Sequence, residues 1–319
     1  MNSRKPIKID DRIHLIDGFD LDMPSRTGSY VIQEDKLTLV ETGPSNSIPY
    51  ILKGLNELQL DPKDIEYIIV THIHLDHSGG AGLLLKDCPN AKIVVHPRGA
   101  RHLVDPSRLV QGARAVYGED FDRLFSPVLP IAEEKLLVME DGDTLQIGEN
   151  CTLTFYDTPG HADHHFSIHD PISNGIFTGD TLGVRYEEHR DLGEKLFLPS
   201  TSPSQFKPDA VLSSLERIKE LNVSKIYFGH FGAESDVEEV YRQIEHWLPI
   251  FMEVGQKAVD TGQDYKWTAK ELVTLVQKSL HEKGVPDDHP IYGILSLDME
   301  VCTMGIHLYI EKLAKRADK

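Results

Sequence analysis

The sequence predicts a mixed α/β fold followed by a helical C-terminal region. Short runs rich in Val, Ile, Tyr, Phe and Thr recur as far as residue 230, and several are separated by stretches in which apolar residues have helical spacing. Near residues 28–41 and 151–179, two strand-like runs follow each other with no helix between them. This pattern is typical of a mixed α/β protein and excludes a simple alternating barrel.

The predicted elements divide the chain into two parts. Strands are predicted at 28–33, 36–41, 67–72, 92–97, 151–158, 164–169, 175–180 and 225–230. Helices are predicted at 47–60 and 208–222, and three more at 237–259, 269–284 and 292–317. We therefore expect a larger domain over residues 1–235 and a helical subdomain over residues 236–319. Segments 97–130 and 182–205 combine Pro, Gly and mixed charge with weak periodicity, so we expect long insertions or lids there.

Composition excludes several classes of function. The chain has 319 residues, 40% of them hydrophobic, and a formal net charge of -18, which would repel a nucleic-acid backbone. The N-terminus lacks the apolar core of a signal peptide, and no run of about 18 apolar residues occurs, so we expect a cytoplasmic protein that does not span a membrane. The three cysteines, Cys88, Cys151 and Cys302, lie far apart and are predicted to be buried free thiols.

The strongest local signal is the run THIHLDHSGG at residues 71–80, directly after the apolar run YIIV. Residues two apart on a strand point to the same side, so His72 and His74 can share one cation as the strand ends. Asp76 and His77 follow in the turn and need not face that same ion. The spacing therefore predicts two neighbouring metal ions.

Three further candidates each follow a predicted strand through a glycine: His161 in TPGH, Asp180 in FTGD and His230 in YFGH. The ends of several strands at one edge of a sheet are where groups from distant parts of a chain converge. Imidazole and carboxylate ligands without thiolate suit zinc, iron, manganese or nickel. We expect two divalent ions, with zinc as first choice and iron or manganese as alternatives.

The chain resembles the metallo-β-lactamase superfamily over residues 11–232, because it contains in this order the motifs HxHxDH, TPGH, TGD and GH. The glyoxalase II-like and lactonase-like members are the most similar in motif. The resemblance implies an αβ/βα sandwich with the metals at one edge, so that residues 1–235 would form the catalytic domain. It also implies a ligand set: His72, His74 and His161 on metal one, Asp76, His77 and His230 on metal two, and Asp180 as the bridge.

The chemistry implied by this resemblance is hydrolysis. Two dications lower the pKa of bound water, and a hydroxide between them would be the nucleophile, with Asp76 available for the leaving-group proton. Three residues are candidates for supporting or substrate-contacting roles. His165 stands in HADHH where glyoxalase II relatives often read HTxGH, Thr181 follows the bridging Asp180, and Tyr186 is placed to contact a substrate oxygen. His189 reads as part of a solvated charged loop.

The resemblance ranks the expected classes of substrate. A carboxyl ester, thioester or lactone comes first and a phosphodiester second, whereas β-lactams come last because β-lactamases usually have Cys or Ser where this chain has Asp180. Flavin-partnered diiron reductases read HxExDH, and this chain has His74. A mononuclear-iron persulfide dioxygenase and a non-catalytic metal-binding protein stay open as other classes. We expect a small-molecule substrate, and the helical tail is a candidate for pairing two chains in a homodimer.

Overall fold

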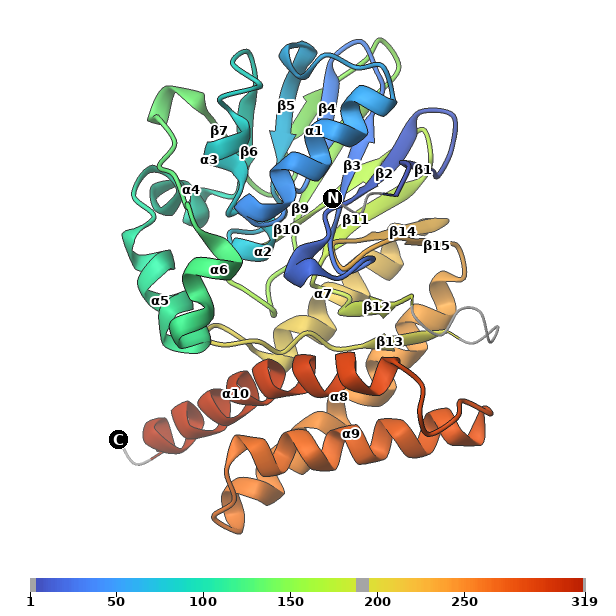
Figure 1. Cartoon of the computed structure of the whole chain (residues 1–319). Coiled ribbons are helices and arrows are strands. Elements are labelled where there is room, and N and C mark those ends of the chain that lie inside the picture. The colour runs from blue at the N-terminus through green and yellow to red at the C-terminus, as the bar shows by residue number, and fades with distance from the viewer. Residues whose placement is uncertain (1–3, 188–194, 318–319) are drawn as a thin grey trace. The chain divides into compact units, whose positions relative to one another are not determined.

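A computed structural model describes residues 4–187 and 195–317 of the chain (Figure 1). The chain forms two compact units, each built from several segments. Unit 1 consists of Met1–Thr158, His164–Gly179 and Asn222–Ser235, and unit 2 of Pro159–Asp163, Asp180–Leu221 and Asp236–Lys319. The last passage from unit 1 to unit 2 falls at the predicted boundary between residues 235 and 236. Unit 2 also takes two earlier segments, and the assignment of a catalytic domain to residues 1–235 stays a prediction.

The first sheet of unit 1 has seven strands in chain order. They are β1 (Ile7–Lys8), β2 (Ile13–Asp17), β3 (Gly28–Ile32), β4 (Leu37–Val40), β5 (Ile65–Ile69), β6 (Lys92–Val95) and β7 (Leu136–Val138). Strands β1 to β4 pair antiparallel, whereas β4 to β7 pair parallel. The carboxyl ends of β4, β5 and β6 therefore meet at one edge of this sheet.

The second sheet of unit 1 has six strands in the order β15-β14-β11-β10-β9-β8. Their bounds are β8 (Thr144–Gln146), β9 (Thr152–Asp157), β10 (Phe166–Asp170), β11 (Gly175–Gly179), β14 (Lys225–Phe228) and β15 (Ala233–Glu234). Only β11 and β14 pair parallel among them. Every strand predicted from the sequence is confirmed as a strand of one of these two sheets.

The two sheets of unit 1 pack face to face through an apolar core. Tyr30 of the first sheet meets Phe177 and Tyr227 of the second, with ring centroids 5.2 and 5.5 Å away. The opposite face of the first sheet is covered by α1 (Ile48–Glu57), whose Ile51 and Leu55 are fully buried. This layer order confirms the predicted sandwich in unit 1.

Some of the remaining helices of unit 1 lie in segment 97–130, which we expected to be an insertion or lid. Short helices α2 (Leu75–Ser78) and α3 (Ala81–Leu84) follow β5. Segment 97–130 contains α4 (Pro97–Val104), α5 (Ser107–Tyr117) and α6 (Phe121–Phe125). No residue of α5 is fully buried, whereas α6 buries Phe121, Leu124 and Phe125.

Unit 2 is mainly helical. It contains the strand pair β12 (Val184–Tyr186) and β13 (Leu196–Leu198), then α7 (Pro208–Glu220), α8 (Val237–Asp260), α9 (Tyr265–Glu282) and α10 (Ile291–Ala317). The predicted C-terminal helices are thus confirmed. His189 lies outside the described residues.

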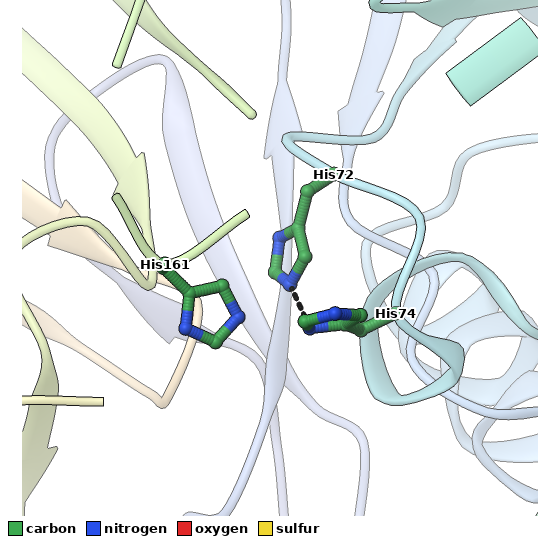
Figure 2. Close-up of side chains that lie close together, drawn as sticks. All are labelled: His72, His74 and His161. Atoms are coloured by element: carbon green, nitrogen blue, oxygen red, sulfur yellow. Dashed lines mark hydrogen bonds between the residues drawn. The ribbon is translucent and has the colours of Figure 1, made fainter. Parts of the chain in front are cut away.

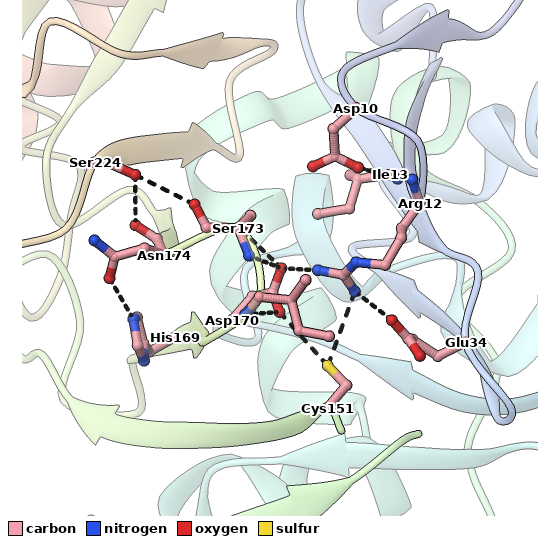
Figure 3. Close-up of polar contacts among 11 residues, drawn as sticks. Asp10, Arg12, Ile13, Glu34, Cys151, His169, Asp170, Ser173, Asn174 and Ser224 are labelled. Carbon is pink, nitrogen blue, oxygen red and sulfur yellow. Dashed lines mark hydrogen bonds and ion pairs between the residues drawn. The ribbon is translucent and has the colours of Figure 1, made fainter. Parts of the chain in front are cut away.

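A buried polar network joins the edges of the two sheets in unit 1 (Figure 3). Arg12, just before β2, pairs with Asp170 at the end of β10 and, at 2.9 Å, with Glu34 after β3. The Asp170 carboxylate is fully buried and also accepts from Ser173 at 2.6 Å and from the thiol of Cys151 at 3.5 Å. Burial, together with the charge of Asp170, raises the pKa of Cys151 to about 12, so this thiol stays protonated.

The three cysteines are buried and free, as predicted. Burial raises the pKa of Cys88 and of Cys302 to about 12 as well. Cys88 and Cys302 therefore act as small, weakly polar groups in the core, whereas Cys151 belongs to the polar network of Asp170.

Candidate metal centre

His72 and His74 lie on the loop that leaves the central parallel strand β5. The His72 Nε2 and His74 Nδ1 atoms are 3.1 Å apart, as Figure 2 shows. His72 is fully buried, and its Nδ1 lies 3.1 Å from the hydroxyl of Thr71. Two ligand atoms at about 2.0–2.1 Å from a tetrahedral ion are about 3.4 Å apart, so this spacing suits a shared cation.

Asp76, His77 and His230 form a second group within unit 1. One ligand atom from each lies within 4.8 Å of the other two. The Asp76 Oδ2 atom is 3.5 Å from His77 Nε2 and 3.6 Å from His230 Nε2, again close to the spacing of two ligands on one ion. His230 reaches this point because β14 ends at Phe228 and Gly229 turns the chain.

The second ring nitrogens of His77 and His230 each face an acceptor oxygen; the His230 contact is a hydrogen bond, whereas the His77 contact is at ion-pair distance. His77 Nδ1 lies 3.3 Å from Glu41 Oε2, and His230 Nδ1 lies 3.2 Å from the carbonyl oxygen of Arg26. An acceptor at Nδ1 keeps the proton there and leaves the Nε2 lone pair for a metal. The tautomers of both imidazoles therefore fit a metal beside Asp76.

His161 and Asp180 form a group in unit 2. His161 Nε2 and Asp180 Oδ2 are 3.6 Å apart, and both side chains are buried. Ser200 orients both: its carbonyl oxygen lies 3.1 Å from His161 Nδ1, and its hydroxyl donates to Asp180 Oδ2 at 2.9 Å. This group is again an imidazole with its Nε2 directed toward a carboxylate.

Glu41 was missed by the sequence reasoning. It follows β4, and its two oxygens have different roles: Oε1 accepts from the backbone N–H of Thr71 at 3.0 Å, and Oε2 faces His77. Glu41 is buried and has a left-handed backbone with φ of 70°. Its signal in the sequence is an acidic residue at the end of the strand that neighbours β5.

The loop before β3 adds a second acidic group near Asp76 and His230. Asp20 is 5% exposed, and its Oδ1 atom is buried with no hydrogen-bond partner. Burial, together with the charge of Asp76, raises the pKa of Asp20 to about 6, against the lowering effect of Arg26 and His230. Phe19, Leu21 and Ser25 of this loop have positive φ, a conformation that recurs at functional sites.

His165 lies beside the metal-binding loop, as its predicted supporting role requires. It is fully buried, its ring stacks on His72 with centroids 5.0 Å apart, and its Nδ1 lies 3.0 Å from the Thr158 hydroxyl. His164, which the sequence reasoning passed over, contacts the same loop edge to face, with its ring centroid 5.5 Å from that of His74. Two additional imidazoles thus surround the first pair of ligands.

The other two predicted supporting residues lie in unit 2. Thr181 is buried next to Asp180. The Tyr186 hydroxyl donates to Asp298 of α10 at 2.9 Å, so contact with a substrate would have to share that hydrogen bond. Both roles stay predictions.

Comparison with known proteins identifies the family. The family model described as metallo-beta-lactamase superfamily matches residues 24–230. The metallo-beta-lactamase fold-containing protein ST1585 of Sulfurisphaera tokodaii is 28% identical over 252 residues, which is 76% of this chain and 88% of that protein. The N-acyl homoserine lactonase AttM of Azorhizobium caulinodans is 33% identical over 175 residues, 54% of this chain and 60% of that protein.

A solved structure supports the same fold. The metallo-beta-lactamase family protein TTHA1429 from Thermus thermophilus has a TM-score of 0.67 at 19% identity, covering 96% of this chain and 95% of that one. This chain belongs to the metallo-beta-lactamase superfamily, which confirms the resemblance and the predicted fold class. Members of this fold generally bind divalent metal ions, and the His and Asp groups of this chain are suited to hold one.

Proposed function

We propose that this protein is a dinuclear metal-dependent hydrolase that cleaves a carboxyl ester, thioester or lactone of a small molecule. In this proposal His161 and Asp180 of unit 2 complete the site formed by His72, His74, Asp76, His77 and His230 of unit 1. The observation that carries the proposal is that seven imidazole and carboxylate side chains lie in three groups, two in unit 1 and one in unit 2, each with spacings that suit a shared cation. We propose zinc as the metal, with iron or manganese as alternatives, because the set contains no thiolate.

Asp180 is suited to bridge the two ions of a site that would act on a carbonyl substrate. A carboxylate can bridge two ions, and Ser200 holds one of its oxygens in place. The lactonase similarity points to the same class of substrate, although AttM covers only part of this chain. The net charge of -18 argues against nucleic acid as the substrate.

Two bound divalent ions would supply hydroxide from water near neutral pH and polarise the carbonyl group. The residues of the protein orient the proposed metal ligands and supply a proton to the leaving group. Glu41 keeps His77 in the tautomer that offers Nε2, and the carbonyl group of Arg26 does the same for His230. Asp76, with 27% of its side chain exposed, is the most open ligand of its group, so it is placed to transfer a proton to the leaving group.

The test is a panel of initial rates on an aryl ester, a thioester, a lactone, a phosphodiester and a β-lactam. Zinc-, manganese- and iron-loaded protein is compared with chelator-stripped protein, and metal per chain is counted. We expect two metals per chain and a metal-dependent rate on one carbonyl substrate. Asp180→Ala and Asp76→Ala should each lose roughly 100-fold or more in kcat/KM.

The control is Asp64→Ala, which removes an exposed carboxylate of the same type and should leave the rate unchanged. A highest rate on the phosphodiester would replace the carbonyl substrate by the second choice. One iron per chain with oxygen uptake on a persulfide would overturn hydrolysis in favour of a dioxygenase. Two metals without any turnover would favour the non-catalytic class.

A further inference from the structure

Helix α10 carries apolar side chains on two opposite sides. One side is buried within unit 2, where α8 and α9 pack against it; its members are Ile291, Leu295, Met299, Cys302, Ile306 and Ile310. The packing is close, since a Cβ on Gly255 of α8 would lie 2.3 Å from the Ile306 Cγ2 atom. This side explains why α10 folds onto its own unit.

The other side bears five apolar residues at alternating steps of three and four: Ile294, Leu297, Val301, Met304 and Leu308. At about 100° per residue they span an arc of roughly 80°, nearly opposite the buried side. Leu297 and Leu308 are 40% and 37% exposed, and the other three are partly buried. We call these five residues the α10 seam.

The spacing of the α10 seam is that of a helix that packs against another helix. Alternating steps of three and four keep the apolar positions on one stripe, as in coiled coils. The seam extends over about 21 Å at 1.5 Å per residue. Exposed apolar stripes of this kind mark interaction sites, because single exposed leucines are ordinary but a periodic row is not.

The two ends of α10 carry opposite charges. Asp287 and Asp288 are exposed just before the helix begins, whereas Lys312, Lys315 and Arg316 are exposed in its last turns. We propose that the α10 seam binds the α10 seam of a second copy of this chain, antiparallel across a two-fold axis. Pairing centred on Val301 brings Ile294 opposite Leu308, and it brings each acidic end beside a basic end.

The antiparallel arrangement is favoured by electrostatics in two ways. In the antiparallel pair the dipoles of the two helices point in opposite directions, and the acidic end of each helix lies beside the basic end of the other. A parallel pair would instead place Asp287 and Asp288 of both copies together. Lys315 also pairs with Glu311 of its own helix at 3.6 Å. Because both side chains are exposed, that pair is weak and leaves the lysine available.

A membrane is the other occupant to consider, since α10 is long and apolar enough by length and composition to cross one. A core helix of a soluble protein passes the same test. The α10 seam is bordered by Glu300 and Glu311, and lysines continue its stripe only beyond Leu308, whereas a helix lying on a lipid surface carries Lys and Arg along its whole polar face. The net charge of -18 would also repel anionic lipid.

The test is sedimentation velocity of the full chain from 1 to 100 μM in 0.15 M salt. We expect a dimer for the wild type and a monomer for Leu297→Glu/Leu308→Glu, with the dimer Kd raised roughly 100-fold or more. Leu313→Glu is the matched control, because Leu313 is 45% exposed on the same helix but lies off the seam. It should remain dimeric, and circular dichroism should show equal helicity in all three proteins.

A charge exchange tests the antiparallel direction. Asp288→Lys and Lys315→Asp should each raise the dimer Kd, and the double variant should restore it. A wild type that stays monomeric at 100 μM would overturn the proposal. If that monomer also co-sediments with phosphatidylcholine or phosphatidylserine vesicles, and Leu297→Glu/Leu308→Glu does not, the occupant of the α10 seam is a membrane and the dimer proposal is wrong. Restoration in the double charge variant would support the pairing described here.

Discussion

Glu41 shows how one buried carboxylate can orient a candidate metal ligand. It links two parts of the HxHxDH loop, since one oxygen binds the backbone of Thr71 and the other faces His77. Acceptors of this kind fix the orientation of the imidazole and increase its basicity. The loop and its ligand are therefore positioned together.

We predict that Glu41→Gln weakens metal binding at the Asp76, His77 and His230 group by about 10- to 100-fold, because the amide is a poorer acceptor for His77 Nδ1. Competition with a chelator of known affinity measures the change. Glu57→Gln, at an exposed position of α1, is the control. Equal affinity in both variants would mean that Glu41 only supports the loop.

Asp20 gives a prediction about pH. Because burial raises its pKa from 3.8 to about 6, the folded protein holds this proton more tightly than the unfolded chain does. The stability due to Asp20 is therefore present in full below pH 3.8 and is lost as the pH rises to about 6.

Asn has no such proton, so Asp20→Asn should gain stability relative to the metal-free wild type between pH 4 and 6.5. The gain should be on the order of 3 kcal/mol, from about two pKa units at 1.36 kcal/mol each. Urea unfolding of both proteins across this pH range measures it. A difference that stays constant with pH would show that Asp20 has an ordinary pKa.

Individual ligands could be predicted from local sequence because each stands in a short motif after an apolar strand. Their supporting groups could not. Glu41 and the carbonyl group of Arg26 reach the site only through strand pairing and a loop, and Ser200 lies 39 residues after His161 in the chain. Those partners are set by tertiary structure, which one sequence does not reveal.

At the scale of elements, the network of Arg12 ties the edges of both sheets. Arg12→Ala should lower the free energy of unfolding by roughly 3–5 kcal/mol, because it leaves the buried Asp170 carboxylate without its cation. Equilibrium unfolding in urea measures this. Lys8→Ala removes an exposed partner of Asp11 and should cost less than about 1 kcal/mol. Similar losses in the two variants would contradict a structural role for the network.

Several strands that were predicted correctly are buried throughout, such as β3, β4 and β11. Strands of two or three residues, including β1, β7 and β8, are too short to give a periodic signal. In segment 97–130, α4 and α6 are short, and α5 has no fully buried residue. Burial does not decide every case, since β2 is buried almost throughout and was not predicted, whereas β9 is partly exposed and was.

At the scale of the whole molecule, metal should stabilise the folded chain. Ions that bind only the folded state add about 4 kcal/mol when free metal is 1,000 times the Kd. Chelator-stripped protein should therefore melt at a lower temperature and recover on addition of zinc, which calorimetry measures. A melting temperature that does not respond to zinc, manganese or iron would contradict a structural contribution of the metals.

The interleaving of the two units has a consequence for biosynthesis. Because unit 1 is completed by Asn222–Ser235, neither unit corresponds to one continuous fragment, and a stop codon after residue 158 or 221 would release an incomplete sandwich. His230 is the last of the proposed ligands to leave the ribosome. Under the proposed function, a nascent chain would carry most of the proposed ligands before it could hold both ions, so metal loading would follow the synthesis of His230.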